Sequence, residues 1–420
     1  MSSRSADTPE EERIVKSPYF TADHEVFRAE VRAFLADEVL PHAARWEREG
    51  GLPRELWKLF GQRGYLGLLH PRDAGGGGRD VFTSVVFLEE LGRTGFGGLR
   101  AAVSVHAYMA THYLARDGGP ELRHRYLAPA VRGDSVAALA ITEPAAGADL
   151  AGLATTATRD GDHYVVNGTK TMVSNGMMAD FAVVAVRTGG VAGDPGRAGM
   201  TGLSLLVADS GLPGIRREPV RTLGWRSAGT ATVTYDDVRV PADRLIGRLN
   251  SGFYYLMRGL QLERLAAATL ALGGIERSLD DLRGFLRGRR VAGDVLAEKQ
   301  APVHRVADLA TELAAARQLV HHTAWLYGEG ELPAAECSMA KLYTTELACR
   351  LADASLQLHG SHGYLEESDV ARAHRDARAA TIAAGPSEVM RDLIGRDVLR
   401  GPAGRGTGPG TRSAGTPGHQ

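Results

Sequence analysis

The sequence has little cysteine and no long apolar run. Only Cys337 and Cys349 occur in the chain. They lie twelve positions apart on what reads as one helix, which turns them to different faces and leaves them too far apart for a disulfide. We therefore expect two buried, reduced thiols in a cytoplasmic protein. No stretch of about 18 apolar residues occurs, so we expect no spanning helix and no membrane partner.

The chain also lacks an excess of charge of one sign. It has 49 Lys and Arg against 50 Asp and Glu, a formal net charge of -1. Nothing in this balance favours a nucleic acid or an anionic membrane as partner. The N-terminal segment, residues 1–16, contains Glu10, Glu11 and Glu12 and no apolar stretch. It does not have the pattern of a secretory signal, and its acidity argues against a transit peptide.

Common catalytic motifs are missing as well. The sequence has no Gly-x-Gly-x-x-Gly after an expected strand, no P-loop, no His-Glu-x-x-His and no Gly-x-Ser-x-Gly. His321 and His322 are adjacent, so on a helix they diverge by about 100° and are poorly placed to chelate one metal. We expect surface or half-buried imidazoles there, and no metal site.

What the sequence does contain predicts a packed α+β protein. Hydrophobic residues make up 44% and charged residues 24% of the chain, which is enough for a core. Helical, β-rich and again helical periodicity follow one another. We expect a helical N-terminal domain over 19–139, a middle antiparallel β domain over 140–245, a C-terminal helical bundle over 246–400, and a disordered tail over 401–420.

Local patterns place the elements within these regions. Apolar residues at helical spacing mark an N-terminal helix (Val26, Val31, Phe34, Leu35 and Val39) and a long C-terminal helix (Val303, Val306, Leu309, Leu313 and Ala316). Residues 163–168 read as a strand that enters an Asn167-Gly168 hairpin, with the return strand over 171–174. The glycines at 75–78 predict a loop between helices, and a phosphate cradle is the functional alternative although no Gly-Lys-Ser/Thr follows.

Five ordered segments carry a family resemblance. They are Thr142-Glu-Pro-Ala-Ala-Gly-Ala-Asp149; Asn167-Gly-Thr-Lys170 with Ser174-Asn-Gly176; Arg289-Arg-Val-Ala-Gly293 with Gln300; Gln357-Leu-His-Gly-Ser-His-Gly-Tyr364; and Arg375-Asp-Ala-Arg378 leading to Gly385-Pro-Ser-Glu388. Together they resemble the acyl-CoA dehydrogenase family over residues 19–400. Residues 252–257 and 262–265 are most similar to its long-chain and isovaleryl members.

The resemblance implies an acyl-CoA dehydrogenase-like fold and a flavoprotein. It implies that the C-terminal part is a four-helix bundle and that FAD lies between the β domain and this bundle, completed by a neighbouring subunit of a homotetramer or homodimer. The implied reaction converts an acyl-CoA, or an acyl group on a carrier protein, to the trans-2-enoyl thioester. An electron-transferring flavoprotein is the implied acceptor.

The resemblance also implies an unusual position for the base. Most members carry a glutamate where this chain has Ala384. The long-chain and isovaleryl branch instead uses a glutamate on a bundle helix, which corresponds to Glu263. We therefore expect Glu263 to remove the α-proton, and the backbone N–H of Ala384 to donate to the thioester oxygen. Without the resemblance, Glu263 and Arg264 read as a solvated helix face.

The same resemblance assigns the other site residues. Substrate contacts are expected from Ala148, Arg264 and Gly385. Cofactor contacts are expected from Ile141, Thr142, Met172, Ser174, Arg289, Gln300, Gln357, Gly360, Gly363, Ser387 and Glu388. The chain departs from the family pattern at Ala148, Ala292, Ala383 and Pro386. The smaller Ala383 leaves more room near the thioester, which favours a branched or substituted acyl chain.

Two other classes of function compete with this interpretation. A flavin monooxygenase on the same fold does not need the base, so Glu263 counts against it. A non-catalytic binding protein with a decayed site is suggested by Ala384. Flavin that is bleached by substrate distinguishes the dehydrogenase from the binding protein.

Overall fold

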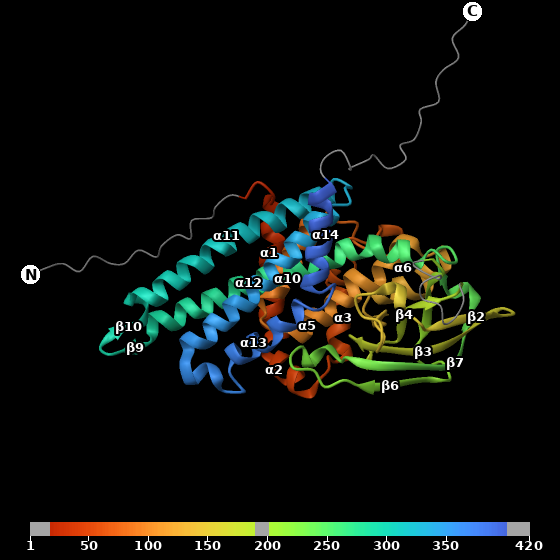
Figure 1. Cartoon of the computed structure of the whole chain (residues 1–420), viewed down its shortest axis with the longest axis horizontal. Coiled ribbons are helices and arrows are strands. Elements are labelled where there is room, and N and C mark those ends of the chain that lie inside the picture. Colours follow the sequence, from red (N-terminus) through yellow and green to blue (C-terminus); the bar gives the residue numbers. More distant parts are fainter. Residues whose placement is uncertain (1–16, 190–200, 401–420) are drawn as a thin grey trace, which may run out of the picture.

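The computed structural model describes residues 17–189 and 201–400 (Figure 1). The segment 1–16 and the expected tail, 401–420, lie outside the described residues. The strands of the main sheet gather at one end of the molecule, and the long helices α10, α11 and α12 extend to the other, where a separate two-stranded hairpin lies (Figure 1). The predicted α+β class is therefore confirmed. No helix in the described ranges combines the length and apolarity needed to cross a bilayer.

Helices make up the first part of the chain. Thr21 caps α1, since its side chain accepts from the His24 N–H while the His24 ring meets the Thr21 N–H. Val31, Phe34, Leu35 and Val39 are buried as their spacing predicts, whereas Val26 is 60% exposed. The elements are α1 (Ala22–Phe34), α2 (Leu40–Glu49), α3 (Arg54–Gln62), α4 (Val81–Arg93), α5 (Gly97–Ser104), α6 (Thr111–Asp117), α7 (Pro120–Leu122) and α8 (Ala128–Val131).

The glycines at 75–78 lie in the loop before α4, as predicted. Gly76 packs against the backbone of His70, where an added Cβ would lie 2.3 Å from the carbonyl oxygen. Asp80 then caps α4 by accepting from the Thr83 N–H. The cluster thus has a packing role in a tight turn.

The middle of the chain forms an eight-stranded sheet. Its order is β6-β7-β3-β2-β4-β5-β8, with β1 parallel to β4. Every residue of β4 is buried, which explains why residues 181–186 are all apolar; Arg187 at its end is buried too, and its guanidinium donates to the carbonyl oxygens of Leu153 and Ala151. The strands are β1 (Ala137–Ala140), β2 (Thr156–Asp160), β3 (His163–Val173), β4 (Phe181–Arg187), β5 (Leu203–Asp209), β6 (Ile215–Pro219), β7 (Ala231–Pro241) and β8 (Leu245–Ile246).

The predicted Asn167-Gly168 hairpin is wrong. β3 runs through both residues, and its pairing with β7 shifts register between Val166 and Gly168. Asn167 uses its side chain across the strands: its amide donates to Asp237 Oδ1 at 2.9 Å, and its oxygen accepts from the Asp237 N–H at 2.8 Å. Asn167 and Gly168 therefore form a β-bulge in β3. The hairpin that joins β2 to β3 turns at Gly161, which has φ +58°.

The C-terminal part is built from long helices. These are α10 (Gly252–Gly288), α11 (Gln300–Gly328), α12 (Ala334–His359), α13 (Asp369–Ala380) and α14 (Ser387–Arg400), with a small hairpin of β9 (Arg290–Val291) and β10 (Asp294–Val295) between α10 and α11. Leu309, Leu313 and Ala316 are buried, but Val303 is 46% exposed. Cys337 is buried and Cys349 half-buried, both as free thiols on α12.

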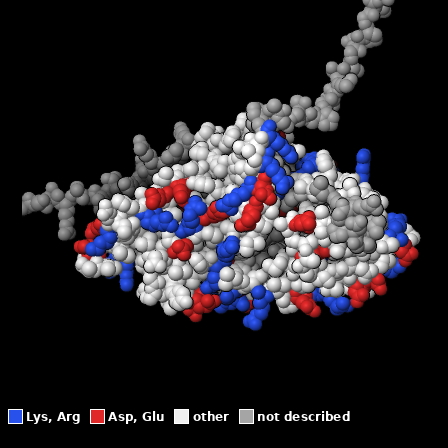
Figure 2. Space-filling view, viewed as in Figure 1, with Lys and Arg blue, Asp and Glu red and all other residues white. Residues whose placement is uncertain are grey.

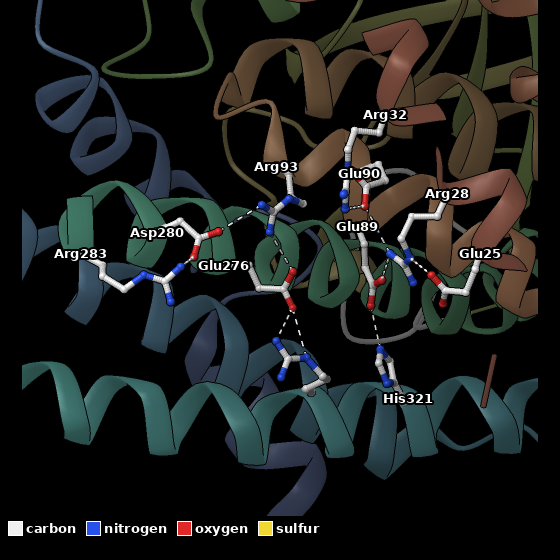
Figure 3. Close-up of polar contacts among 11 residues, drawn as sticks. Glu25, Arg28, Arg32, Glu89, Glu90, Arg93, Glu276, Asp280, Arg283 and His321 are labelled. Carbon is white, nitrogen blue, oxygen red and sulfur yellow. Dashed lines mark hydrogen bonds and ion pairs between the residues drawn. The ribbon is translucent and has the colours of Figure 1, made fainter. Parts of the chain in front are cut away.

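A buried ionic cluster links α1, α4 and α11 (Figure 3). Glu89 accepts from Arg28 Nη1 at 2.7 Å, and its other oxygen lies 2.7 Å from His321 Nε2. Burial alone would raise the pKa of Glu89, but His321 and Arg28 outweigh it and hold the pKa below its usual value. The expectation of an exposed or half-buried imidazole is wrong for His321, since it has this buried carboxylate as partner.

Helices α4 and α10 approach each other through glycines. A Cβ on Gly273 would lie 2.0 Å from the Glu89 carbonyl oxygen, and one on Gly92 would lie 2.5 Å from the Leu270 carbonyl oxygen. Both obstacles are backbone atoms within helices, which cannot move alone. The absence of side chains at these two positions sets how closely α10 lies against the N-terminal helices.

Gly273→Ala should therefore destabilise the protein by about 3 kcal/mol or more, because it forces two helices apart. Gly284→Ala is the matched control on the same helix, where an added Cβ meets nothing within 4 Å. That change should be neutral or stabilise by about 0.5–1 kcal/mol. Denaturant unfolding of both variants measures the difference, and equal stability of the two would contradict the close approach.

Candidate active site

Glu263 lies in the buried middle of α10. Its side chain is enclosed, with a relative exposure of 4%. Burial raises the pKa of Glu263 to about 7, although a hydrogen bond from Tyr113 and the charge of Arg264 both oppose the rise. The Tyr113 hydroxyl donates to Glu263 Oε1 at 2.9 Å. The solvated helix face is thus excluded, and a carboxylate with this pKa is suited to general-base chemistry near neutral pH.

Arg264 is buried beside Glu263. Its exposure is 5%, and its Nε has no hydrogen-bond partner among the described residues. Burial lowers the pKa of Arg264, while the adjacent Glu263 raises it. A buried guanidinium N–H without a protein acceptor is unfavourable unless a ligand satisfies it. Arg264 is therefore available to a polar group of a substrate.

The loop before α14 has an unusual backbone. Ala384 and Gly385 have φ +54° and +97°, two successive left-handed residues of which only the second is glycine. Lys341 of α12 supports this conformation, because its buried Nζ donates to the Gly385 carbonyl oxygen at 2.6 Å. Burial also lowers the pKa of Lys341 to about 8. No described carbonyl accepts from the Ala384 N–H, so this donor is free.

A second group of predicted residues meets at the end of β1 and on β3. The Thr171 N–H donates to the Thr142 carbonyl at 2.8 Å and so joins the two segments. Next to it, Met172 has φ +56° and is 54% exposed, and Ser174 is half-buried. Ile141 is half-buried, while Ala148 is exposed in the following loop. A partly exposed methionine held beside Thr142 provides an apolar surface for a ring system.

A buried ion pair supports this segment, and the sequence prediction missed it. Lys170 Nζ donates to Glu143 Oε1 at 2.7 Å and to the Ile141 carbonyl at 3.0 Å. Glu143 also accepts from the N–H groups of Ala154 and Thr155. Glu143 and Lys170 both lie within the segments that carry the family resemblance. The spacing of those segments does not show that the two side chains form an ion pair.

The remaining predicted residues lie at the far end of the bundle. Arg289 directly follows α10, so at about 1.5 Å per residue its backbone lies about 39 Å from Glu263 along the helix. It lines a surface groove of about 470 Å³ with His359, His362 and Ser368. Gln357 is exposed and Gly363 buried near the end of α12, where Gly360 has φ +60°. Gln300 is exposed at the start of α11, outside the groove lining.

The structure thus places the predicted residues in three groups and not in one. Glu263 and Arg264 lie on α10, and the loop that carries Ala384 and Gly385 is held by Lys341 against α12. Ser387 and Glu388 begin α14, with Ser387 buried and Glu388 exposed. The groove with Arg289 is too distant to act on the same small group as Glu263 within one chain.

Observations in all three groups fit a flavin dinucleotide. Ser387 Oγ is buried without a hydrogen-bond partner in the described chain, and Met172 offers an exposed apolar face. Arg289 is exposed and makes no ion pair with the described residues, so its charge is free for a phosphate. Among these residues no cluster of three His, Cys, Asp or Glu is arranged to hold a metal.

Comparison with known proteins agrees with this geometry. Models of the N-terminal, middle and C-terminal domains of acyl-CoA dehydrogenase match residues 21–134, 138–238 and 250–399. The long-chain specific acyl-CoA dehydrogenase of pig mitochondria is 35% identical over 381 residues, which cover 90% of this chain and 87% of that protein. The chain belongs to the acyl-CoA dehydrogenase family. It is therefore a flavin-dependent oxidoreductase of CH–CH donors, and FAD is its cofactor.

Solved structures of the acyl-CoA dehydrogenase family superpose closely on this chain. An acyl-CoA dehydrogenase from Geobacillus kaustophilus has a TM-score of 0.87 at 38% identity and covers 91% of this chain and 100% of its own. A prolyl acyl carrier protein oxidase has a TM-score of 0.83 at 27% identity and covers 90% and 99%. The same fold thus occurs in an acyl-CoA dehydrogenase and in a prolyl acyl carrier protein oxidase.

Proposed function

We propose that this acyl-CoA dehydrogenase converts an acyl-CoA to the trans-2-enoyl thioester, with Glu263 as the base. The observation that carries the proposal is the buried Glu263 carboxylate, whose pKa burial raises to about 7. At neutral pH a large fraction is ionised, yet its basicity is greater than that of an exposed carboxylate. In the reaction the Cα–H bond breaks, the proton passes to Glu263, and negative charge develops on the thioester oxygen.

The chain supplies a donor for that developing charge. The free N–H of Ala384 lies in the loop that Lys341 holds through Gly385, so its direction is fixed before substrate arrives. Gly385 and Ala148 complete the substrate side in this proposal, and Arg264 contributes its unpartnered Nε–H. When bound, FAD accepts the hydride from the β carbon.

The cofactor contacts are divided between subunits in this proposal. Ile141, Thr142, Met172, Ser174, Ser387 and Glu388 hold the flavin end in one subunit. Arg289, Gln300, Gln357, Gly360 and Gly363 bind the dinucleotide of a neighbouring subunit. The separation of about 39 Å between Glu263 and Arg289 along α10 supports this division. A homodimer or homotetramer follows from it, with residues 19–139, 140–245 and 246–400 as the three domains of each subunit.

An acyl group on a carrier protein is the second candidate substrate, favoured by the similarity to the prolyl acyl carrier protein oxidase. Both donors present the same pantetheine thioester, so the same base and the same Ala384 N–H serve either.

An electron-transferring flavoprotein is the proposed acceptor. On the face shown in Figure 2, basic and acidic side chains are interspersed around the bundle.

The test is anaerobic titration of the purified yellow protein with straight and branched acyl-CoAs, followed by flavin absorbance. Bleaching by an acyl-CoA, with a trans-2-enoyl product, supports the first candidate. Bleaching only by carrier-bound thioesters selects the second. If FAD is bound and neither class of thioester bleaches it, the dehydrogenase proposal is wrong and an oxygen-using reaction on the same fold is the next to examine.

A further inference from the structure

Glu263 is held by one side chain from another domain. Tyr113 on α6 is 1% exposed, and its hydroxyl donates to Glu263 Oε1 at 2.9 Å. Among residues 17–189 and 201–400, no other hydrogen bond reaches this carboxylate. One oxygen of the base is therefore occupied, and Oε2 has no partner in the described chain.

The contact depends on a glycine in α10. Gly259 precedes Glu263 by about one helical turn, and a Cβ there would lie 2.4 Å from Tyr113 Oη and 2.5 Å from the ring carbons Cε1 and Cζ. The phenol thus lies against bare helix backbone on its way to the carboxylate. Glycine in a helix interior is unfavourable by itself, so its presence here is explained by the room that it leaves for Tyr113.

We propose that Tyr113 is the positioning residue of the base, holding Oε1 of Glu263 so that Oε2 stays free to receive the α-proton. The inference rests on the proposed function. A glutamate side chain has three rotatable bonds, and a base that is fixed before substrate binds loses less entropy on reaching the reactive geometry. Tyr113 itself does not touch the reacting atoms in this arrangement.

The same hydrogen bond adjusts the charge state of the base. Burial raises the pKa of Glu263 to about 7, and Tyr113 and Arg264 lower it. These are the two polar groups that face the carboxylate, one from α6 and one from α10. Asp117 of α6 acts on Tyr113, and Cys337 of α12 acts on Arg264. Loss of the Tyr113 hydroxyl leaves burial unchanged, so the pKa of Glu263 should rise further.

Tyr113→Phe tests the inference, because it removes one oxygen and keeps the ring. The rate of flavin reduction by the best acyl thioester is measured from about pH 5 to about pH 9. The acid limb of the profile should move up by about one pH unit, which is about a tenfold loss of rate at the acid end. The rate at high pH should stay within a few-fold of the wild-type rate.

Tyr126→Phe is the matched control. Tyr126 is also buried, and its hydroxyl also donates to a carboxylate, Asp209 Oδ2, at 3.0 Å. That pair joins the π-helical segment Arg123–Leu127 to β5, and neither residue is among the groups that act on Glu263. The control should lose a comparable hydrogen bond without moving the acid limb. Equal profiles for Tyr113→Phe and Tyr126→Phe would show that Tyr113 has a structural role alone.

A second readout does not depend on turnover. The infrared C=O band of protonated Glu263 is identified by its loss in Glu263→Gln, and its titration is followed in wild type and in Tyr113→Phe. A titration that moves to higher pH supports the inference even if no tested thioester is a substrate, so failure of the proposed function is distinguished from failure of this one. An unmoved titration overturns it.

Gly259→Ala provides an alternative test of the inference if the Tyr113→Phe variant does not fold. Its methyl group displaces the phenol from the carboxylate while the hydroxyl remains in the chain. The acid limb and the infrared titration should then shift in the same direction as in Tyr113→Phe. A rate that increases at every pH in either variant would instead mean that Tyr113 restrains the base, which overturns the proposal.

Discussion

Glu263→Gln should lower the rate of flavin reduction by about 10²–10⁴-fold, the usual contribution of a positioned base. The substitution keeps size and shape but cannot accept the α-proton. Because Glu263 is buried with a pKa raised to about 7, a neutral amide at this position should not disturb the fold. FAD content and the oligomeric state are expected to match the wild type. Stopped-flow absorbance with a saturating acyl thioester measures the effect.

Glu276→Gln is the matched control on the same helix. Glu276 is an ion-paired carboxylate of α10 that binds Arg93 (Figure 3). It also binds Arg317 of α11. Its loss should reduce stability, since two guanidinium groups lose a partner, but should leave flavin reduction unchanged. If Glu263→Gln and Glu276→Gln reduce flavin at the same rate, Glu263 is not the base and the proposed mechanism is wrong.

The second large effect is a loss of stability in mild acid. His70 and His106 are fully enclosed, and burial lowers their pKa values to about 3 and about 4. In the unfolded chain both titrate near 6.5. Below about pH 6.5 the unfolded state therefore binds protons that the folded state does not, and stability falls by about 1.4 kcal/mol per pH unit for each histidine. Denaturant unfolding at about pH 7 and about pH 5 measures the slope.

His70→Gln separates this contribution from other acid effects. Its amide is long enough to meet Thr111 Oγ1, which His70 Nε2 contacts at 2.9 Å, but it does not titrate. The variant should lose about 2 kcal/mol less stability than the wild type between about pH 7 and about pH 5. A His70→Gln slope equal to the wild-type slope would contradict the assignment.

Several elements could be predicted from periodicity because each depends on local chemistry. The buried stripe from Val31 to Val39 and the apolar run 181–186 of β4 are set by the need to cover apolar faces. The Asn167-Gly168 prediction was wrong for an equally physical reason. Asn167 bonds to Asp237, a residue 70 positions away, and no local pattern contains that partner.

The same distinction between local pattern and long-range contact applies to the candidate active site. The order of the motifs indicated the family, and with it the positions of Glu263, Ala384 and Arg289. These residues could be named from the sequence alone. The enclosure of Glu263, its contact with Tyr113 and the support of Gly385 by Lys341 are relations between distant segments. They decide the pKa of the base and the direction of the free N–H, and neither is a property of a motif.

By itself, the sequence determined the helix, sheet and helix order, the family and the residue types available for chemistry. Only the tertiary structure decided which groups are buried together. Two glycines let α10 lie against α4, a third leaves room for Tyr113 over the helix, and the packing around Glu263 removes the water that would otherwise keep its pKa low. Desolvation depends on every neighbour at once, and those neighbours come from segments far apart in the chain.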